Sequence, residues 1–213
     1  MDTRRLLALS GVAFVVIALV AIIGLGGDTP SNDASAAKVA QFYSDHSARN
    51  AIAAFVLAAS IPFLVFFAVA LANALWPGGE SRPVWPYVLI GGAALTGASL
   101  LAAAWIHFAL ADGGDNKVDP AGLQALNVLD AGSWVAFNGA FGVMMLGAAG
   151  CFLTRARGHV WLGWVALVLG IALFIPFADF FALILTLIWI IVVSIMLARG
   201  AWGRSDGEAL PAT

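Results

Sequence analysis

Six apolar runs, separated by short polar segments, constrain most strongly what this chain can fold into. The runs are residues 6–26, 51–75, 86–111, 131–153, 160–177 and 180–198. Each run is close to the length of about 20 residues that a helix needs to cross the hydrocarbon core of a bilayer. A segment inside a bilayer must satisfy its own backbone hydrogen bonds, which favours helices over open sheets. The sequence therefore predicts an all-α integral-membrane bundle of six transmembrane helices that forms a single domain, residues 1–213.

The composition excludes most soluble functions. Hydrophobic residues make up 62% of the 213 residues and charged residues make up 10%, whereas a soluble domain carries about 25% charged residues. The net charge is −2, without the basic face or stacking motifs of a nucleic-acid binder. Cys151 is the single cysteine, which excludes an internal disulfide and any cysteine-based zinc or iron–sulfur site held by one chain. We therefore expect no nucleic-acid partner.

The last two runs must fold back on each other. Residues 160–198 would form one helix of about 58 Å at 1.5 Å per residue, which is about twice the thickness of the hydrocarbon core. The interruption inside this stretch is IPFADFF, where Pro176 weakens the helical ladder and Asp179 prefers water. We therefore expect a tight hairpin at this point.

Two loops on the same side of the membrane carry helical signals. Residues 27–50 form the longest connection, and Val39, Phe42, Tyr43 and His46 follow one another at helical spacing. This stripe predicts a short interfacial helix that lies along the membrane surface or caps the bundle. In the second loop Asp119 precedes a proline, which is the preferred start of a helix. The fourth helix is therefore expected to begin near residue 120.

The distribution of Lys and Arg predicts the orientation. With the N-terminus inside, the inner segments hold Arg4, Arg5, Arg82, Arg155, Arg157, Arg199 and Arg204, and the outer segments hold Lys38, Arg49 and Lys117. Because basic residues favour the cytoplasmic side, both termini are expected in the cytoplasm, with the chain in the cell membrane and residues 199–213 as a tail. An alternative is a cleaved signal peptide with Ala34-Ser35-Ala36 as the cleavage site. Its apolar region is too long for a signal core, which favours an uncleaved helix.

Three stretches resemble a known group of proteins. They are KVAQFYSDHSARNAIAAFVLA before the second run, GLQALNVLDAGSW before the fourth, and RARGHVWLGWVALVLG at the start of the fifth. The chain is similar to a family of small bacterial multi-pass membrane proteins, especially actinobacterial ones, that share a domain of unknown function. The resemblance implies a helical integral-membrane fold. It implies no activity, and it transfers no catalytic residues.

Unusual polar side chains gather toward the outer ends of the predicted helices. This candidate ligand-binding cluster consists of His46, His107, Asp112, Asp130, Asn138 and Asp179. Histidines with carboxylates can bind a divalent metal or relay protons, whereas helix caps and interfacial groups would need no ligand. No His-x3-His or similarly tight ligand spacing is present, so no metal site is predicted. His159 lies on the other side of the bilayer, which argues against a pair of haem-ligating histidines.

Small residues dominate the third and fourth runs, in GGAALTGASLLAAA and NGAFGVMMLGAAG. Such residues let helices approach closely in lipid, and few charges lie within the runs. The sequence therefore favours a non-enzymatic accessory protein or scaffold that contacts lipid, without catalytic residues or cofactors. Its expected partners are the lipid bilayer and either another membrane protein or a second copy of the chain. The alternative is a small-solute or cation binder, or a transporter, with an acidic outer mouth.

Overall fold

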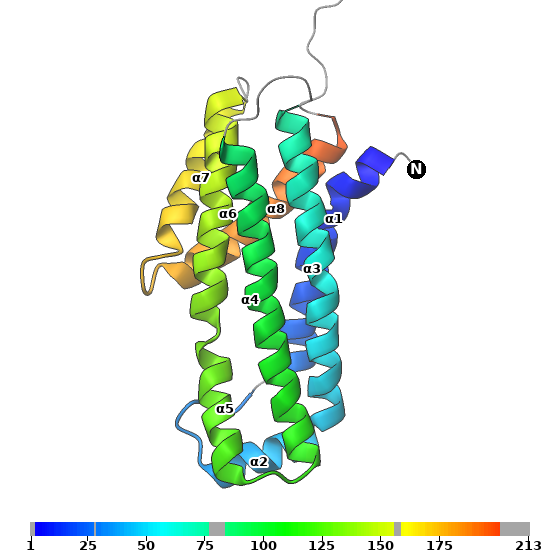
Figure 1. Ribbon diagram of the computed structural model, residues 1–213, viewed down its shortest axis with the longest axis vertical. Coiled ribbons are helices and arrows are strands. Elements are labelled where there is room, and N and C mark those ends of the chain that lie inside the picture. The colour runs from blue at the N-terminus through cyan, green and yellow to red at the C-terminus, as the bar shows by residue number, and fades with distance from the viewer. Residues whose placement is uncertain (1–2, 28, 77–83, 156–158, 201–213) are drawn as a thin grey trace, which may run out of the picture.

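The computed structural model describes residues 3–27, 29–76, 84–155 and 159–200, and every regular element within them is a helix (Figure 1). In chain order these elements are α1 (Thr3–Leu19), η1 (Val20–Gly26), α2 (Ala36–Asp45), α3 (Ser47–Leu75), α4 (Val84–Asp115), α5 (Pro120–Gly132), α6 (Trp134–Arg155), α7 (Val160–Ala172) and α8 (Asp179–Ala198). The predicted all-α class is confirmed. The predicted tail lies outside the described residues from position 201 onward.

Five of the described segments are long and apolar enough to cross a membrane. They are Arg5–Gly26, Ser47–Leu75, Val84–Asp115, Pro120–Arg155 and Asp179–Ala198. The remaining predicted span, residues 160–177, is shorter than expected, because α7 ends at Ala172 after 13 residues, which is about 20 Å of helix. Phe174 and Ile175 then form tight i→i−3 backbone bonds, to Ile171 and Ala172, that turn the chain.

The helices form a bundle in which α4 packs between α3 and α6. α1 packs on α3, α7 packs on α6, and α8 contacts both α1 and α7. One glycine shows how closely the helices approach, since a Cβ placed on Gly147 of α6 would overlap the backbone of α4 at Leu89. This contact agrees with the small-residue packing expected from the sequence. The core between the helices is apolar, with Phe67, Met144 and Ile190 fully buried.

A second, smaller core lies at one end of the bundle, which we call the α2 end. There α2 packs across α4 and α5 (Figure 1), with Val39, Tyr43, Leu110 and Leu123 buried between them. The short helix predicted in the first loop is therefore confirmed, and its apolar stripe points into the bundle. Asp119 accepts a hydrogen bond from the Ala121 amide at 3.1 Å and so caps α5, as its place before a proline predicted.

The first span does not end as an α-helix. Its last seven residues, Val20–Gly26, form the π-helix η1, in which backbone bonds run from i to i+5 and each turn is wider than in an α-helix. Ala21 and Gly26 are five residues apart and both are buried. Gly27 follows at φ +65°, a conformation that favours glycine. The wide helical turn and the glycine together shape the side of the bundle where the candidate site lies.

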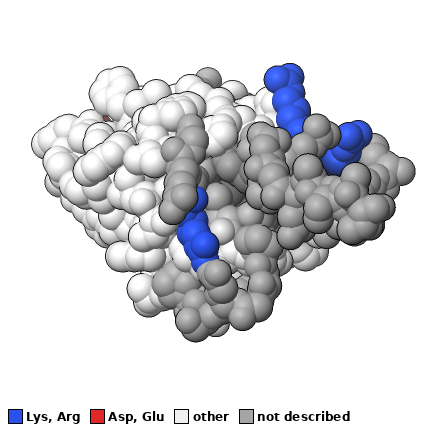
Figure 2. Space-filling model, turned by 90° about the horizontal axis from the view of Figure 1, so that it is seen from above, with Lys and Arg blue, Asp and Glu red and all other residues white. Residues whose placement is uncertain are grey.

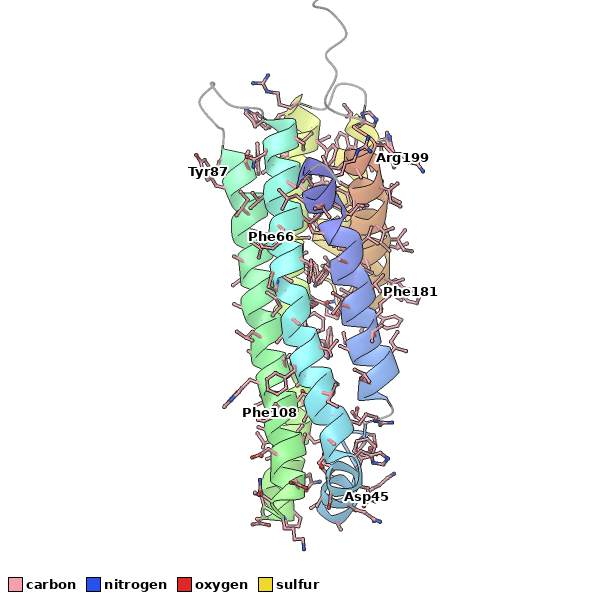
Figure 3. The ribbon with its side chains drawn as sticks, turned by 90° about the vertical axis from the view of Figure 1, so that its right-hand side faces the viewer. Asp45, Phe66, Tyr87, Phe108, Phe181 and Arg199 are labelled. Carbon is pink, nitrogen blue, oxygen red and sulfur yellow. The ribbon has the colours of Figure 1, made fainter. Side chains whose placement is uncertain are left out.

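The surface of the bundle has a long apolar belt with charges toward its ends. Phe66, Tyr87 and Phe181 project outward along its length, between Arg199 near one end and Asp45 at the other (Figure 3). The end opposite α2 carries basic side chains, which appear blue in Figure 2. The acidic side chains within the described part of the chain are Asp33, Asp45, Asp112, Asp115, Asp119, Asp130 and Asp179. All but Asp179 lie in or beside α2, α5 and the last turns of α4, whereas Asp179 begins α8. This distribution is typical of a membrane protein.

Candidate functional site

His107 of α4 joins three helices near the α2 end. Its Nδ1 lies 3.0 Å from Asp130 Oδ2 on α5, and its Nε2 lies 3.0 Å from Asn50 Oδ1 on α3. Asn50 is fully buried, and its Nδ2 donates to the carbonyl oxygen of His46 at 2.9 Å. That bond fixes the orientation of the amide, so its oxygen faces the histidine. The side chains of His107 and Asp130 are 15% and 18% exposed.

The partners of His107 determine which hydrogen bonds this pair can make. An amide oxygen and a carboxylate oxygen are acceptors, so both ring nitrogens of His107 face acceptors. The arrangement is fully hydrogen-bonded when His107 carries a proton on each nitrogen, or when one of the two protons lies on Asp130. The pair therefore places polar groups in the bundle whose hydrogen-bonding atoms face one another and Asn50.

Tyr43 of α2 covers this pair from the α2 end. Its ring meets the His107 ring edge-on, with 6.1 Å between centroids, and its hydroxyl donates to Asn127 Oδ1 at 3.4 Å. Asn127 in turn donates to the carbonyl oxygen of Pro30 at 3.2 Å. Burial raises the pKa of Tyr43, and the nearby charge of Asp130 raises it further. Tyr43 therefore stays neutral and closes the polar site on this side.

A cavity of about 250 Å³ extends from the His107–Asp130 pair into the side of the bundle. It is lined by Ala21, Ile22, Gly26, Gly27, Thr29, Ala53, Ala54, Leu57, Leu100, Ala103, His107, Asp130, Ser133, Trp134 and Phe137. We call it the lateral pocket, because Ile22 and Trp134 in its lining are also about half exposed on the outer surface. Its walls are mainly alanine and other apolar side chains, and its polar groups lie at one end. The pocket is therefore amphipathic.

A second polar pair lies deeper in the bundle. Asn138 Nδ2 of α6 donates to Asp179 Oδ2 at the start of α8, at 3.1 Å, and both side chains are buried. Asn138 Oδ1 is buried without a hydrogen-bond partner among the described residues. Asn138 follows Asp130 by eight residues, about 12 Å of helix, so the two pairs are separate. This second pair fixes the α7–α8 hairpin to α6.

The structure thus joins four of the six candidate residues, as two pairs, and leaves the other two outside them. His46 donates from Nδ1 to its own helix at Phe42 O, 3.0 Å away, and stacks on that ring. Asp112 is exposed and accepts from Asn116 Nδ2 at 3.2 Å. Each of these two side chains therefore forms its hydrogen bond with a residue four positions away in its own segment. Across the described residues, no three His, Cys, Asp or Glu side chains lie together as a metal site would require.

Asn50 is the functional residue that the sequence analysis did not identify. Its signal was an amide directly before the apolar run 51–75, four residues after His46. Such a group in a membrane helix usually hydrogen-bonds to a neighbouring helix, which is what Asn50 does with His107. Tyr43 was recognised as part of an apolar stripe, and its position against His107 depends on how α2 folds over α4.

Comparison with family models, curated proteins and solved structures finds no match to this chain. The resemblance to bacterial membrane proteins of unknown function therefore remains a prediction. The chemistry of the site has to be interpreted from its own residues.

Proposed function

We propose that this chain is a non-enzymatic accessory or scaffold protein of the cell membrane, and that it holds a membrane amphiphile in the lateral pocket. The observation that carries the proposal is the pocket itself, a cavity of about 250 Å³ with apolar walls and one polar end. Its volume is below the range of about 300–1,000 Å³ typical of sites for drug-sized ligands. A segment of a lipid chain fits this volume better than a large polar substrate.

The polar end favours binding over catalysis. His107 uses both ring nitrogens, for Asn50 and for Asp130. Neither nitrogen is therefore left to remove a proton from a ligand, as a general base must. The same bonds hold the pair rigidly at one end of the pocket, where it can hydrogen-bond to the polar part of an amphiphile. The site is thus suited to recognising a molecule without transforming it.

Selectivity in such a pocket has to come from shape and from its polar end. Lipid tails are as apolar as leucine, so moving a chain from the bilayer into the pocket gains little hydrophobic free energy. Small side chains at Ala53, Ala54 and Ala103 leave the space for the chain. Filling that space with a larger side chain should therefore remove binding.

The orientation proposed here has both termini in the cytoplasm. Arg5, Arg155 and Arg199 support it, because they lie at the end opposite α2 and basic residues favour the cytoplasmic side. The Arg155 guanidinium also lies over the Trp76 ring, 5.0 Å from its centroid. A reporter domain fused after residue 213 is therefore expected to be active on the cytoplasmic side.

Lipid analysis of the purified protein tests the proposed function. We expect lipid to remain bound after purification in a mild detergent and to be detected by mass spectrometry. Ala103→Phe, which fills the pocket, should remove it. Ala102→Phe is the matched control, because Ala102 is the next residue on α4 and is exposed. Equal lipid content in both variants would contradict the proposal, as would binding of a divalent cation that His107→Ala abolishes.

The same purification tests for the partners that a scaffold requires, which we propose are another membrane protein or a second copy of the chain. We expect a partner to co-purify from the native host in mild detergent. If the chain purifies as a monomer with no membrane protein attached, the scaffold role is wrong even where lipid is bound.

A further inference from the structure

The rim of the lateral pocket carries a cationic side chain from α3. Gly27 belongs to the pocket lining, and the guanidinium of Arg49 lies against it, so that a Cβ placed on Gly27 would be 2.8 Å from an Arg49 nitrogen. Arg49 is exposed. Its charged group therefore lies at the edge of the cavity, next to Gly27, the positive-φ glycine that follows η1.

The register of α3 places Arg49 directly beyond the apolar wall. Residues four apart lie on the same face of a helix, so Arg49 is on the face of Ala53, a lining residue, one turn nearer the α2 end. In the same way Asn50, which binds His107, is one turn from Ala54. The α3 wall therefore changes from apolar to polar and cationic over a single helical turn.

The depth of this transition matches that of a lipid headgroup. Gly26 and Gly27 lie where the first apolar run ends, and polar or basic side chains at the ends of spans sit at the membrane interface. A chain lying in the pocket, among Leu57, Leu100 and Phe137, would extend toward the middle of the bundle. Its headgroup would then lie beside Arg49.

The charges around the rim favour an anion. Asp130, the carboxylate that lines the pocket, already has a partner in His107, 3.0 Å away. Among the described residues Arg49 has no carboxylate within 4.0 Å, since His107–Asp130 is the ion pair found there. A guanidinium presents a planar set of donors that matches a phosphate and binds it with two parallel hydrogen bonds. Within the described part of the chain, the Arg49 guanidinium thus has donors at the rim that no carboxylate uses.

We infer that the occupant of the lateral pocket is a phospholipid with a net negative headgroup, whose phosphate binds Arg49 and whose acyl chain fills the cavity. This inference rests on the proposed function, because it names the class of amphiphile that the same pocket holds. Arg49 selects the headgroup, and the alanine-lined wall accommodates the chain.

Competition measured by native mass spectrometry in a neutral detergent tests the inference. The probes are phosphatidylglycerol, diacylglycerol with the same acyl chains, and inorganic phosphate. We expect the full-length protein to bind phosphatidylglycerol about ten-fold or more tightly than diacylglycerol, which is the effect of one charge-assisted hydrogen bond. Arg49→Gln should reduce this ratio to near one without weakening diacylglycerol. Arg199→Gln is the control, because Arg199 is exposed near the opposite end of the bundle.

The two proposals fail in different ways. If Arg49→Gln keeps the preference for phosphatidylglycerol, the assignment of the headgroup to Arg49 is wrong and the pocket remains a lipid site. If inorganic phosphate displaces phosphatidylglycerol, the rim is a site for free anions and the lipid assignment is wrong. If Ala103→Phe binds both lipids as the unchanged protein does, the pocket is not the lipid site and the proposed function fails as well.

Discussion

Replacing His107 with phenylalanine tests whether the three-helix junction stabilises the bundle. Phenylalanine fills a similar space but removes the donors to Asn50 and Asp130, both at 3.0 Å. A hydrogen bond to a charged group contributes about 1.5–3 kcal/mol and a neutral one about 1 kcal/mol, although bonds between membrane helices average about 0.6 kcal/mol. Asp130 is 18% exposed, so water can replace part of the hydrogen bond that it loses. Asn50 is fully buried, so its oxygen is left without a donor. We therefore expect His107→Phe to lower the free energy of unfolding by about 2–3 kcal/mol.

A double-mutant cycle with Asp130→Leu isolates the histidine–aspartate bond. Replacing both partners by apolar groups is often nearly neutral, so the double variant should lose less stability than the sum of the two single variants. We expect a coupling of about 1–1.7 kcal/mol, whose upper value is the largest found in double-mutant cycles of one membrane protein. The assay is unfolding by sodium dodecyl sulfate in mixed micelles, followed by circular dichroism. If the stability losses of the two single variants sum to that of the double variant within about 0.5 kcal/mol, as for independent sites, the pairing is refuted.

Three other predictions follow from described contacts. Asn138→Ala should cost about 1–3 kcal/mol in the same unfolding assay, because Asp179 is left buried without its donor; an unchanged midpoint would contradict the hairpin attachment. Gly147→Val should prevent stable folding, detected as aggregation on gel filtration, since its Cβ overlaps the α4 backbone, whereas Gly139→Ala, with its nearest neighbour atom at 3.7 Å, should be tolerated. Above about pH 10 the protein should lose stability, because the unfolded chain ionises Tyr43 while burial raises its pKa in the folded state; Tyr43→Phe should reduce this loss, and an identical alkaline dependence would show that Tyr43 is not its source.

The sequence predicted most of the fold because membrane crossing depends on length and apolar composition, which are visible residue by residue. The start of α5 at Pro120 and the short helix before α3 followed from local signals. The end of α7 could not be predicted, because the turn residues are themselves apolar. Phe177 is 91% exposed at φ +71°, so hydrophobicity alone gave no reason to end the helix before Pro176.

The candidate site was predictable by residue type but not by pairing. His107 meets Asp130 because α4 and α5 are consecutive and antiparallel (Figure 1). Asp179 meets Asn138 because the α7–α8 hairpin folds back onto α6, a contact that depends on where α7 ends. His46 lies in the α2–α3 connection and bonds within its own helix. A search for unusual polar residues therefore found the members of both pairs, whereas their pairing and the pocket depend on the arrangement of the helices.

The π-helix at the end of the first span lets this segment hold one residue more than an α-helix would need. Residues five apart lie about 140° apart around an α-helix, at about 100° per residue, whereas the wider turn of a π-helix brings them onto one face. Ala21 and Gly26 are such a pair, and both line the lateral pocket. A deletion of a single residue between them would leave them four residues apart, which is the spacing of one face of an α-helix. The pocket wall should therefore tolerate that deletion, whereas an insertion at the same place should remove one of the two residues from the wall.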